Sequence, residues 1–163
     1  MIRYKNLLVK KESKRQLVKA FNNFLDSGFY LNGKQTEILE KKIAKLCKRK
    51  YCILNSSGTN SLYLAIRSLN LSKNDEILCP NISWIATSAI IKFLNIKIKF
   101  IDVNYDQNIN PYEIEKNISK NTKAIIFVNF TGQLAEFNKI KIVAKKYQLY
   151  TIEDAAQSFG ASK

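Results

Sequence analysis

The sequence of 163 residues contains no histidine. Histidine is the usual general base near neutral pH and the commonest metal ligand, so any such chemistry must fall to other side chains. Cysteine is also scarce: Cys47, Cys52 and Cys79 show no metal-binding or redox-motif spacing. We expect these three residues to be buried, unreactive thiols, and we expect no metal site.

Long apolar runs are missing as well. No stretch of eighteen apolar residues is present, so no membrane span is expected, and the N-terminus lacks the apolar core of a secretory signal. Hydrophobic residues nevertheless make up 46% of the chain, which is enough for a folded protein. These features predict a soluble cytoplasmic protein.

Acidic residues are outnumbered by basic ones, 13 to 27, which gives a formal net charge of +14. Such an excess can indicate a nucleic-acid partner. Here the basic residues are spread over the polar faces of separate predicted helices, as at residues 41–42, 48–50 and 145–146. Solvated helix faces explain that distribution better, and we expect no nucleic-acid partner.

Helix-like and strand-like segments alternate along the chain. The hydrophobic spacing predicts helices over residues 14–25, 34–49, 59–69, 84–94 and 134–147, and Asn110, Pro111 and Glu113 indicate a further helix start. Strands are predicted over residues 51–54, 76–79, 98–101, 124–129 and 149–152. This order predicts a three-layer α/β fold with a mainly parallel sheet, and residues 1–30 resemble a separate helical arm.

The last predicted strand ends at Glu153 and Asp154 and passes into small residues. A buried strand there would deliver a carboxylate to the carboxyl edge of the sheet, where open α/β sheets bind their ligands. Asp154 is therefore a candidate site residue, although it could also be a helix cap or a turn residue. Gln157 follows three positions later and could reach the same site.

Two further segments lie at predicted strand ends. Residues 56–59 read Ser-Ser-Gly-Thr before a helix, where free backbone N–H groups, Gly58 and the hydroxyls of Ser57 and Thr59 could hold a phosphate. Ser and Thr also cap helices routinely. Trp84, the only tryptophan, could fill the core or form a flat wall for a planar ligand. A phosphate anchor, an aromatic wall and a carboxylate together suit pyridoxal phosphate.

The order of several motifs resembles the DegT/DnrJ/EryC1/StrS aminotransferases, which make amino sugars. Residues 56–62 are similar to the Ser-Gly-Thr-x-x-Leu segment of that family, and residues 153–161, Glu-Asp-Ala-Ala-Gln-Ser-Phe-Gly-Ala, resemble its last matching motif, which is fairly specific. Matching segments in the same order are residues 27–28 with 32–33, 75–77, 80–87, 100–103, 122–126 and 132–133. The resemblance covers nearly the whole chain.

The resemblance implies part of the large domain of an aspartate-aminotransferase-like, fold type I enzyme with pyridoxal 5′-phosphate as cofactor. Asp154 would pair with the pyridine nitrogen and Trp84 would stack on the ring. The phosphate would lie on Ser57, Gly58 and Thr59. Gln157 would lie near the ring hydroxyl, with Asn129, where many relatives have histidine, close by.

The lysine that binds the cofactor covalently in this family lies farther downstream than this chain extends, and Lys163 is not expected to replace it. The resemblance therefore implies that residues 31–163 are an incomplete cofactor-binding domain and that the small C-terminal domain is absent. This chain alone would be inactive. The full-length protein would be a homodimer that converts a keto nucleotide-sugar to an amino sugar, with glutamate as the amino donor.

Three other interpretations stay open at this point. The chain could be an inactive remnant or an interaction partner of an intact paralogue. Relatives that carry histidine in place of the lysine act as dehydratases, so a pyridoxal-phosphate-dependent sugar dehydratase is a further alternative. A different α/β ligand-binding domain with a chance match is the third.

Overall fold

The computed structural model describes residues 8–31 and 33–162 of the chain. These residues fall into two compact units, one ending at Leu54 and the other beginning at Asn55. Each unit has its own internal contacts. The expected division near residue 30 stays a prediction.

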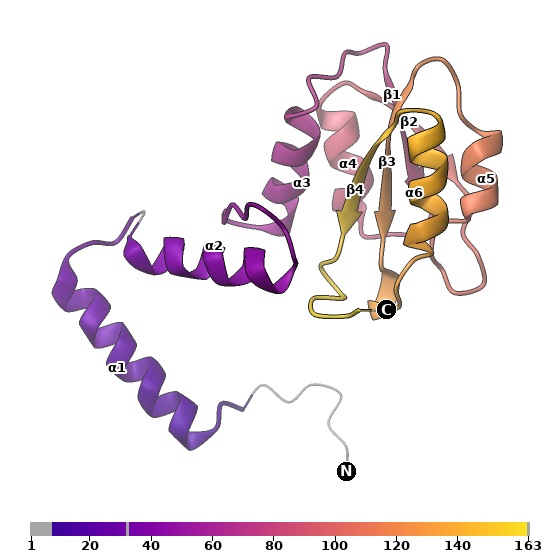
Figure 1. Ribbon diagram of the computed structural model, residues 1–163. Helices are drawn as coiled ribbons and strands as arrows, with labels where there is room; N and C mark the ends of the chain where they lie inside the picture. The colour runs from indigo at the N-terminus through magenta and orange to yellow at the C-terminus, as the bar shows by residue number, and fades with distance from the viewer. Residues whose placement is uncertain (1–7, 32, 163) are drawn as a thin grey trace. The chain divides into compact units, whose positions relative to one another are not determined.

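The first unit contains two helices, α1 (Lys11–Ser27) and α2 (Lys34–Leu46) (Figure 1). Helix α1 ends where Gly28 adopts a left-handed conformation, with φ of 67°, and donates its N–H to the carbonyl of Leu25. The helix predicted over residues 14–25 thus ends close to its expected end, since glycine enters the left-handed region without steric cost. The apolar side chains on one face of α1 are all exposed: Leu17, Val18, Phe21, Phe24 and Leu25.

The strand predicted over residues 51–54 is wrong. These residues follow α2 in an irregular conformation, and Tyr51 and Ile53 are 74% and 77% exposed. The backbone N–H of Leu54 instead donates to the Glu40 carboxylate at 2.8 Å. Apolar, β-branched residues favour a strand only where a neighbouring strand pairs with them, and the described residues supply none here.

The second unit is a parallel four-stranded sheet in the order β2-β1-β3-β4, with helices packed on it (Figure 1). The strands are β1 (Glu76–Pro80), β2 (Lys97–Ile101), β3 (Thr122–Val128) and β4 (Tyr150–Asp154). The helices are α3 (Gly58–Arg67), α4 (Ile85–Phe93), α5 (Pro111–Lys116) and α6 (Phe137–Lys146), with a short 3-10 turn η1 (Phe130–Gly132). The predicted parallel α/β architecture is confirmed.

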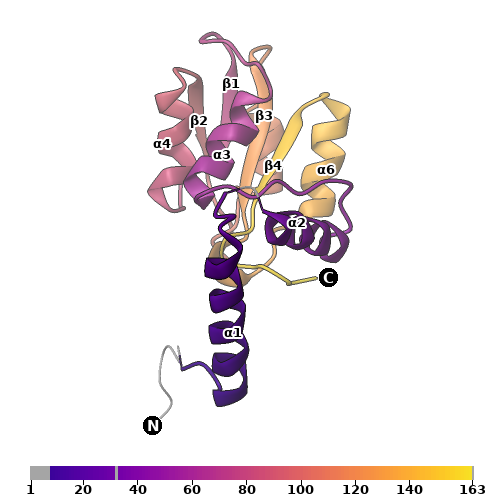
Figure 2. The same cartoon turned by 90° about the vertical axis from the view of Figure 1, so that its left-hand side faces the viewer.

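Both faces of the sheet are covered, because successive residues of the central strands point to opposite sides. One layer joins Ile77 and Cys79 of β1 to Ile66 of α3 and Ile91 of α4. Figure 2 shows α3 and α4 in front of the sheet, on the side away from α6. The predicted three-layer arrangement follows from this alternation.

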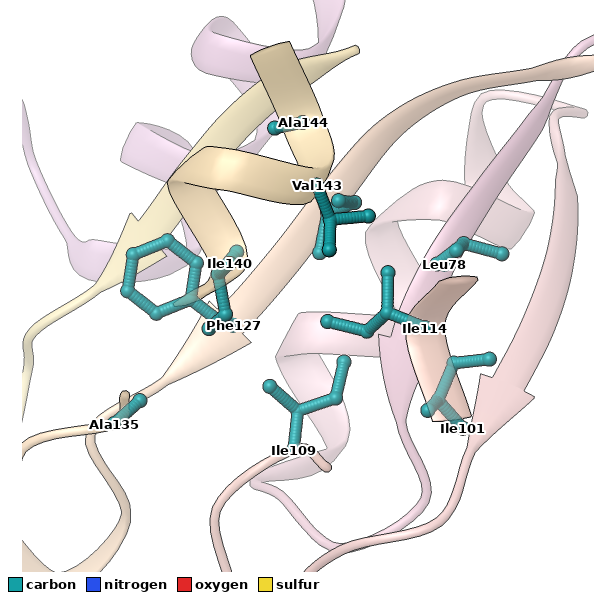
Figure 3. Close-up of a cluster of buried hydrophobic side chains, with 10 residues drawn as sticks. Leu78, Ile101, Ile109, Ile114, Phe127, Ala135, Ile140, Val143 and Ala144 are labelled. Carbon is teal, nitrogen blue, oxygen red and sulfur yellow. The ribbon is translucent and has the colours of Figure 1, made fainter. Parts of the chain in front are cut away.

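The opposite layer is drawn in Figure 3. There Ile140 and Val143 of α6 lie against Phe127 of β3, and Ile114 of α5 packs into the same cluster. Helix α5 begins as expected: Asn110 caps it by accepting the N–H of Tyr112 at 3.0 Å, and Pro111 occupies the first turn.

The last strand differs from the prediction in one respect. Strand β4 ends at Asp154 as expected, but it is an edge strand rather than a buried one. Tyr150, Thr151 and Glu153 are exposed, and only Ile152 packs against a core layer. The short apolar run at residues 149–152 reflects burial on one face and pairing with β3, which periodicity alone does not distinguish from full burial.

The expectation of three buried thiols is also wrong. Cys79 is buried in β1, but Cys52 is partly exposed and Cys47 is exposed at the end of α2. All three cysteines are free. Burial raises the pKa of the Cys79 thiol to about 12, so that this thiol alone fits the inert role.

Candidate functional site

The sheet order β2-β1-β3-β4 makes the carboxyl ends of β1 and β3 the topological switch point of the second unit. After β1 the chain forms β2 on one side of β1, and it then returns to form β3 on the other side of β1. The helix after β1, α4, covers one face, and the helix after β3, α6, covers the other. Loops that leave neighbouring strands toward opposite faces open a crevice between them, and open α/β sheets bind ligands there.

Asp154 ends β4 at this same edge and is partly buried. Its Oδ1 accepts the backbone N–H of Ala156 at 3.2 Å, and its Oδ2 accepts the Thr87 hydroxyl at 3.2 Å. Each carboxylate oxygen therefore has one protein donor. A carboxylate oxygen has two lone pairs, so both oxygens can accept a further hydrogen bond from a ligand.

Thr87, which the sequence analysis assigned no role, is fully buried in the first turn of α4. Its hydroxyl also lies 2.9 Å from that of Ser83. The sequence did contain a signal, since Thr87 is a hydroxyl residue three positions after Trp84 in a segment that already resembled the family. A buried polar side chain beside a strand-end carboxylate can be recognised only once the fold joins α4 to β4.

Trp84 immediately precedes α4 as its N-terminal flanking residue and is 72% exposed. The indole therefore does not fill the core of the described residues. The carbonyl of Trp84 accepts the N–H of Thr87 at 3.0 Å, so the indole residue and the partner of Asp154 belong to one helical turn. The structure thus connects two of the predicted site residues through Thr87.

The predicted anion site forms the N-terminus of α3. Ser57 caps the helix by accepting the N–H of Asn60 at 3.2 Å. Within the described ranges, the N–H groups of Gly58 and Thr59 and the Thr59 hydroxyl have no protein partner. A Cβ on Gly58 would meet no atom within 4 Å, so a ligand can approach the backbone there. These donors and the helix dipole suit an anion.

Gln157 lies in the loop after β4, and its Oε1 accepts the backbone N–H of Thr131 at 2.6 Å. A backbone N–H can only donate, so the oxygen of the amide faces Thr131 and the NH₂ group is the free end. Gln157 can therefore act toward a ligand as a hydrogen-bond donor. This fits a ligand oxygen rather than a ligand N–H.

Asn129 follows β3 and is 2% exposed. Its NH₂ group donates to Glu153 at 2.7 Å and to Ser158 at 3.0 Å, and its oxygen accepts the N–H of Ala135 at 3.0 Å. The amide has its protein partners already. Asn129 therefore joins the loops after β3 and β4 and is not free to bind a ligand.

The predicted residues thus fall into two groups at one edge of the sheet. Asp154 and Trp84 are connected through Thr87, and Gln157 lies in the loop that follows Asp154. The second group, Ser57, Gly58 and Thr59, forms the start of α3, which packs beside α4 and meets β4. Joint contact of both groups with one ligand stays a prediction. Asn32 and Lys163, which entered the sequence interpretation, lie outside the described residues.

The described residues, 8–31 and 33–162, lack two further features. No group of three or more Cys, Asp or Glu side chains there could hold a metal ion. In the same ranges, no helix combines the length and the apolar character that a bilayer span requires.

Comparison with known proteins places these features in a family context. The profile of the DegT/DnrJ/EryC1/StrS aminotransferase family matches residues 11–163. A dTDP-3-amino-3,6-dideoxy-alpha-D-galactopyranose transaminase of Aneurinibacillus thermoaerophilus is 35% identical over 148 residues, 90% of this chain and 41% of the relative. A UDP-2-acetamido-2-deoxy-3-oxo-D-glucuronate aminotransferase of Pseudomonas aeruginosa is 37% identical over 139 residues, 85% of this chain and 39% of the relative.

Solved structures show the same likeness. NtdA from Bacillus subtilis with bound cofactor PMP superposes with a TM-score of 0.90 at 27% identity, covering 94% of this chain and 36% of NtdA. A GDP-4-keto-6-deoxymannose-3-dehydratase with a trapped PLP-glutamate geminal diamine gives a TM-score of 0.83 at 30% identity, covering 89% of this chain and 39% of the dehydratase. The expected fold class, part of the large domain of fold type I enzymes, is confirmed.

Proposed function

The chain belongs to the DegT/DnrJ/EryC1/StrS aminotransferase family, and from this premise we propose that it is part of an aminotransferase that converts a keto nucleotide-sugar to an amino sugar. The expected amino donor is glutamate. The chain spans about 40% of the length of the curated relatives that it matches, 41% and 39%, so the activity proposed is that of the whole protein. Family membership removes the chance-match interpretation.

The cofactor proposed for this site is pyridoxal 5′-phosphate, which supplies an electron sink for the charge that develops on the substrate carbon. The donor set of the chain fits this group. Asp154 offers carboxylate lone pairs for a protonated ring nitrogen, and the start of α3 offers free N–H and hydroxyl donors for a phosphate. Gln157 offers an NH₂ group, since its oxygen is already occupied by Thr131.

The roles proposed for the residues follow from these groups. Asp154 accepts the ring N–H, and Trp84 covers one face of the ring. Ser57, Gly58 and Thr59 hold the phosphate, and Gln157 donates to the ring hydroxyl oxygen. The observation that carries the proposal is the position of Asp154: its carboxylate lies at the end of β4 and is bonded to the helical turn that begins at the exposed Trp84.

The proposed partners are a nucleotide-sugar, an amino acid and a second copy of the full-length chain, with no nucleic acid and no membrane. The exposed apolar face of α1 supports an association between protein surfaces. We place the protein in the cytoplasm, because three free cysteines fit a reducing compartment.

A dehydratase is the second candidate function. It is favoured by the 30% identity to a GDP-4-keto-6-deoxymannose-3-dehydratase over 89% of this chain. The residues proposed to hold the cofactor would serve either reaction. An aminotransferase adds nitrogen to the sugar, whereas a dehydratase removes an oxygen, so the mass of the product distinguishes the two.

The test uses the full-length protein and its Asp154→Ala variant. After loading with pyridoxal phosphate, L-glutamate should abolish the visible absorption of the bound cofactor, and a keto nucleotide-sugar should restore it. Mass spectrometry should show a sugar product that has gained an amino group. The Asp154→Ala variant should fold but turn over at least about a hundredfold more slowly, which corresponds to about 2.7 kcal/mol of lost transition-state stabilisation. A wild-type protein that takes up no pyridoxal phosphate would contradict the proposal.

A further inference from the structure

A line of three polar side chains runs from the loop after β1 to the end of β4. The Ser83 and Thr87 hydroxyl oxygens lie 2.9 Å apart, and the Thr87 hydroxyl lies 3.2 Å from Oδ2 of Asp154. Thr87 is 0% exposed, and Asp154 comes 67 residues later in the chain. The line therefore joins two elements that are distant in sequence, α4 and β4.

The chemistry of these groups fixes the direction of the hydrogen bonds. An ionised carboxylate only accepts, so Thr87 gives its single hydroxyl hydrogen to Asp154. Thr87 then has no hydrogen left for Ser83. The bond between the two hydroxyls must therefore run from Ser83 to Thr87, and each donor in the line polarises the next.

The position of Thr87 is unusual for a helical threonine. In a helix, Ser and Thr hydroxyls commonly bond back to a carbonyl of the preceding turn. The Thr87 hydroxyl instead reaches across to a strand end. Valine has the same shape as threonine and would serve equally well if this position required packing alone. A buried hydroxyl is unfavourable unless it has a hydrogen-bond partner, so the hydroxyl of Thr87 indicates that its bond to Asp154 matters.

The Asp154 carboxylate is held at both oxygens. Ala156 donates to Oδ1 from the loop after β4, and Thr87 donates to Oδ2 from α4. Two donors from different directions restrict rotation of the carboxylate. The remaining lone pairs then face a defined direction, which is what a carboxylate needs to meet one ring nitrogen.

We propose that Thr87 is a positioning residue of this site: it orients the Asp154 carboxylate toward the ring nitrogen of the bound cofactor, and Ser83 sets the direction of the Thr87 hydroxyl. This inference rests on the proposed function. Thr87 is fully buried and acts through its hydrogen bond to Asp154. Its N–H donates to the carbonyl of Trp84 at 3.0 Å, so the turn that orients the carboxylate is also the turn that begins at the indole residue.

The chain contains a matched control for this role. Thr122 is 4% exposed, and its hydroxyl donates to the carboxylate of Glu76 at 2.8 Å. These two residues lie at the amino ends of β3 and β1, the edge of the sheet opposite the site. The same substitution, threonine to valine, thus removes the same kind of hydrogen bond at either edge.

The experiment compares Thr87→Val, Thr87→Ser and Thr122→Val in the full-length protein. The measurements are the dissociation constant for pyridoxal phosphate by equilibrium dialysis, the circular dichroism of the bound cofactor, and the thermal midpoint without cofactor. Thr87→Val should weaken cofactor binding about tenfold, the effect of losing a bond to a charged group, and should change the cofactor dichroism. Thr87→Ser keeps the hydroxyl, so its cofactor affinity and cofactor dichroism should both stay within about twofold of the wild-type values. Thr122→Val should lower only the thermal midpoint.

Several outcomes would overturn the inference. One is a Thr87→Val protein with wild-type affinity and dichroism, and another is equal loss of affinity in Thr122→Val. If Thr87→Val does not fold, Ser83→Ala decides: it should weaken binding measurably, and an unchanged affinity and dichroism would refute the role. If the wild-type protein itself takes up no cofactor, the proposed function fails and the role of Thr87 fails with it. Normal uptake by both wild type and Thr87→Val refutes the role of Thr87 alone.

Discussion

The backbone N–H of Thr131 donates to Oε1 of Gln157 at 2.6 Å, across 26 residues of sequence. The bond links the turn after β3 to the loop after β4 and fixes which end of the amide remains free. The same two loops are joined by Asn129, whose N–H donates to the carbonyl of Asp154 at 3.2 Å. The loop that presents the proposed cofactor ligands is therefore held by its neighbour.

Gln157→Glu should separate the folding role of this side chain from its binding role. A carboxylate still accepts the Thr131 N–H, but it presents an oxygen where the amide presented NH₂. We expect an unchanged thermal midpoint and cofactor binding weakened by roughly tenfold or more, measured by dialysis on the full-length protein. Gln148→Glu is the control, because Gln148 is exposed and precedes β4 at the other edge. Equal affinities in both variants would contradict the donor role.

Asn129→Ala should destabilise the fold strongly. The substitution removes two donors and one acceptor, and it leaves the buried N–H of Ala135 without its partner. We expect a loss of about 2 to 4 kcal/mol in the free energy of unfolding, measured with urea. Asn110→Ala, which removes only the cap of α5, should cost about 1 kcal/mol. A loss in Asn129→Ala no larger than that of Asn110→Ala would argue against the bridging role.

The sequence predicted the central fold well because local and global signals agree there. The cap at Asn110, the break at Gly28 and the apolar run of β3 each have a cause within a few residues, and the structure contains all three. The ends of strands could also be predicted from nearby residues. The end of β4 at Asp154 follows from the change from apolar to small and polar residues.

Features that depend on distant neighbours could not be predicted in this way. Residues 51–54 have the composition of a strand but no strand beside them, and β4 has an apolar run but lies at an edge. Thr87 and Asn129 draw their importance from partners 67 and 24 residues away. The spacing of residues in the sequence does not indicate such pairs, which can be recognised only in the folded structure.

The three cysteines should react with a thiol reagent in a fixed order. Cys47 is exposed and should react first. Cys52 should react second, because burial and the nearby Glu40 carboxylate raise the pKa of its thiol. Burial raises the pKa of Cys79 to about 12, and the thiolate is the reactive form, so Cys79 should react only after unfolding. Peptide mass mapping at successive times identifies each site. Cys47→Ser should remove the fast phase, and early labelling of Cys79 would show that β1 is not buried.

The exposed apolar face of α1 should matter for association. Phe21 is 58% exposed at the centre of a face that also contains Leu17, Val18, Phe24 and Leu25. If this face is buried between two copies of the full-length protein, Phe21→Asp should weaken the dimer at least about tenfold, since burying such a side chain contributes about 1.5 to 3 kcal/mol. Sedimentation across a concentration series measures the change. Asn23→Asp adds the same charge on the opposite side of α1 and should leave the dimer intact, whereas equal effects would argue for charge alone.

Asp75 should make stability depend on pH at the acid end. Its Oδ2 accepts the N–H and the hydroxyl of Ser72 at 2.7 and 2.8 Å, and these bonds lower the pKa of the carboxyl. A carboxyl whose pKa is lower in the folded state stabilises the fold above its unfolded pKa, about 3.9, and loses this contribution as the pH falls through the folded value. The urea midpoint of Asp75→Asn should therefore lie below that of the wild type at pH 7, and the two should converge as the pH approaches about 2. A difference that stays constant over this range would show that the charge of Asp75 does not contribute, because the amide keeps an acceptor oxygen for Ser72 at every pH.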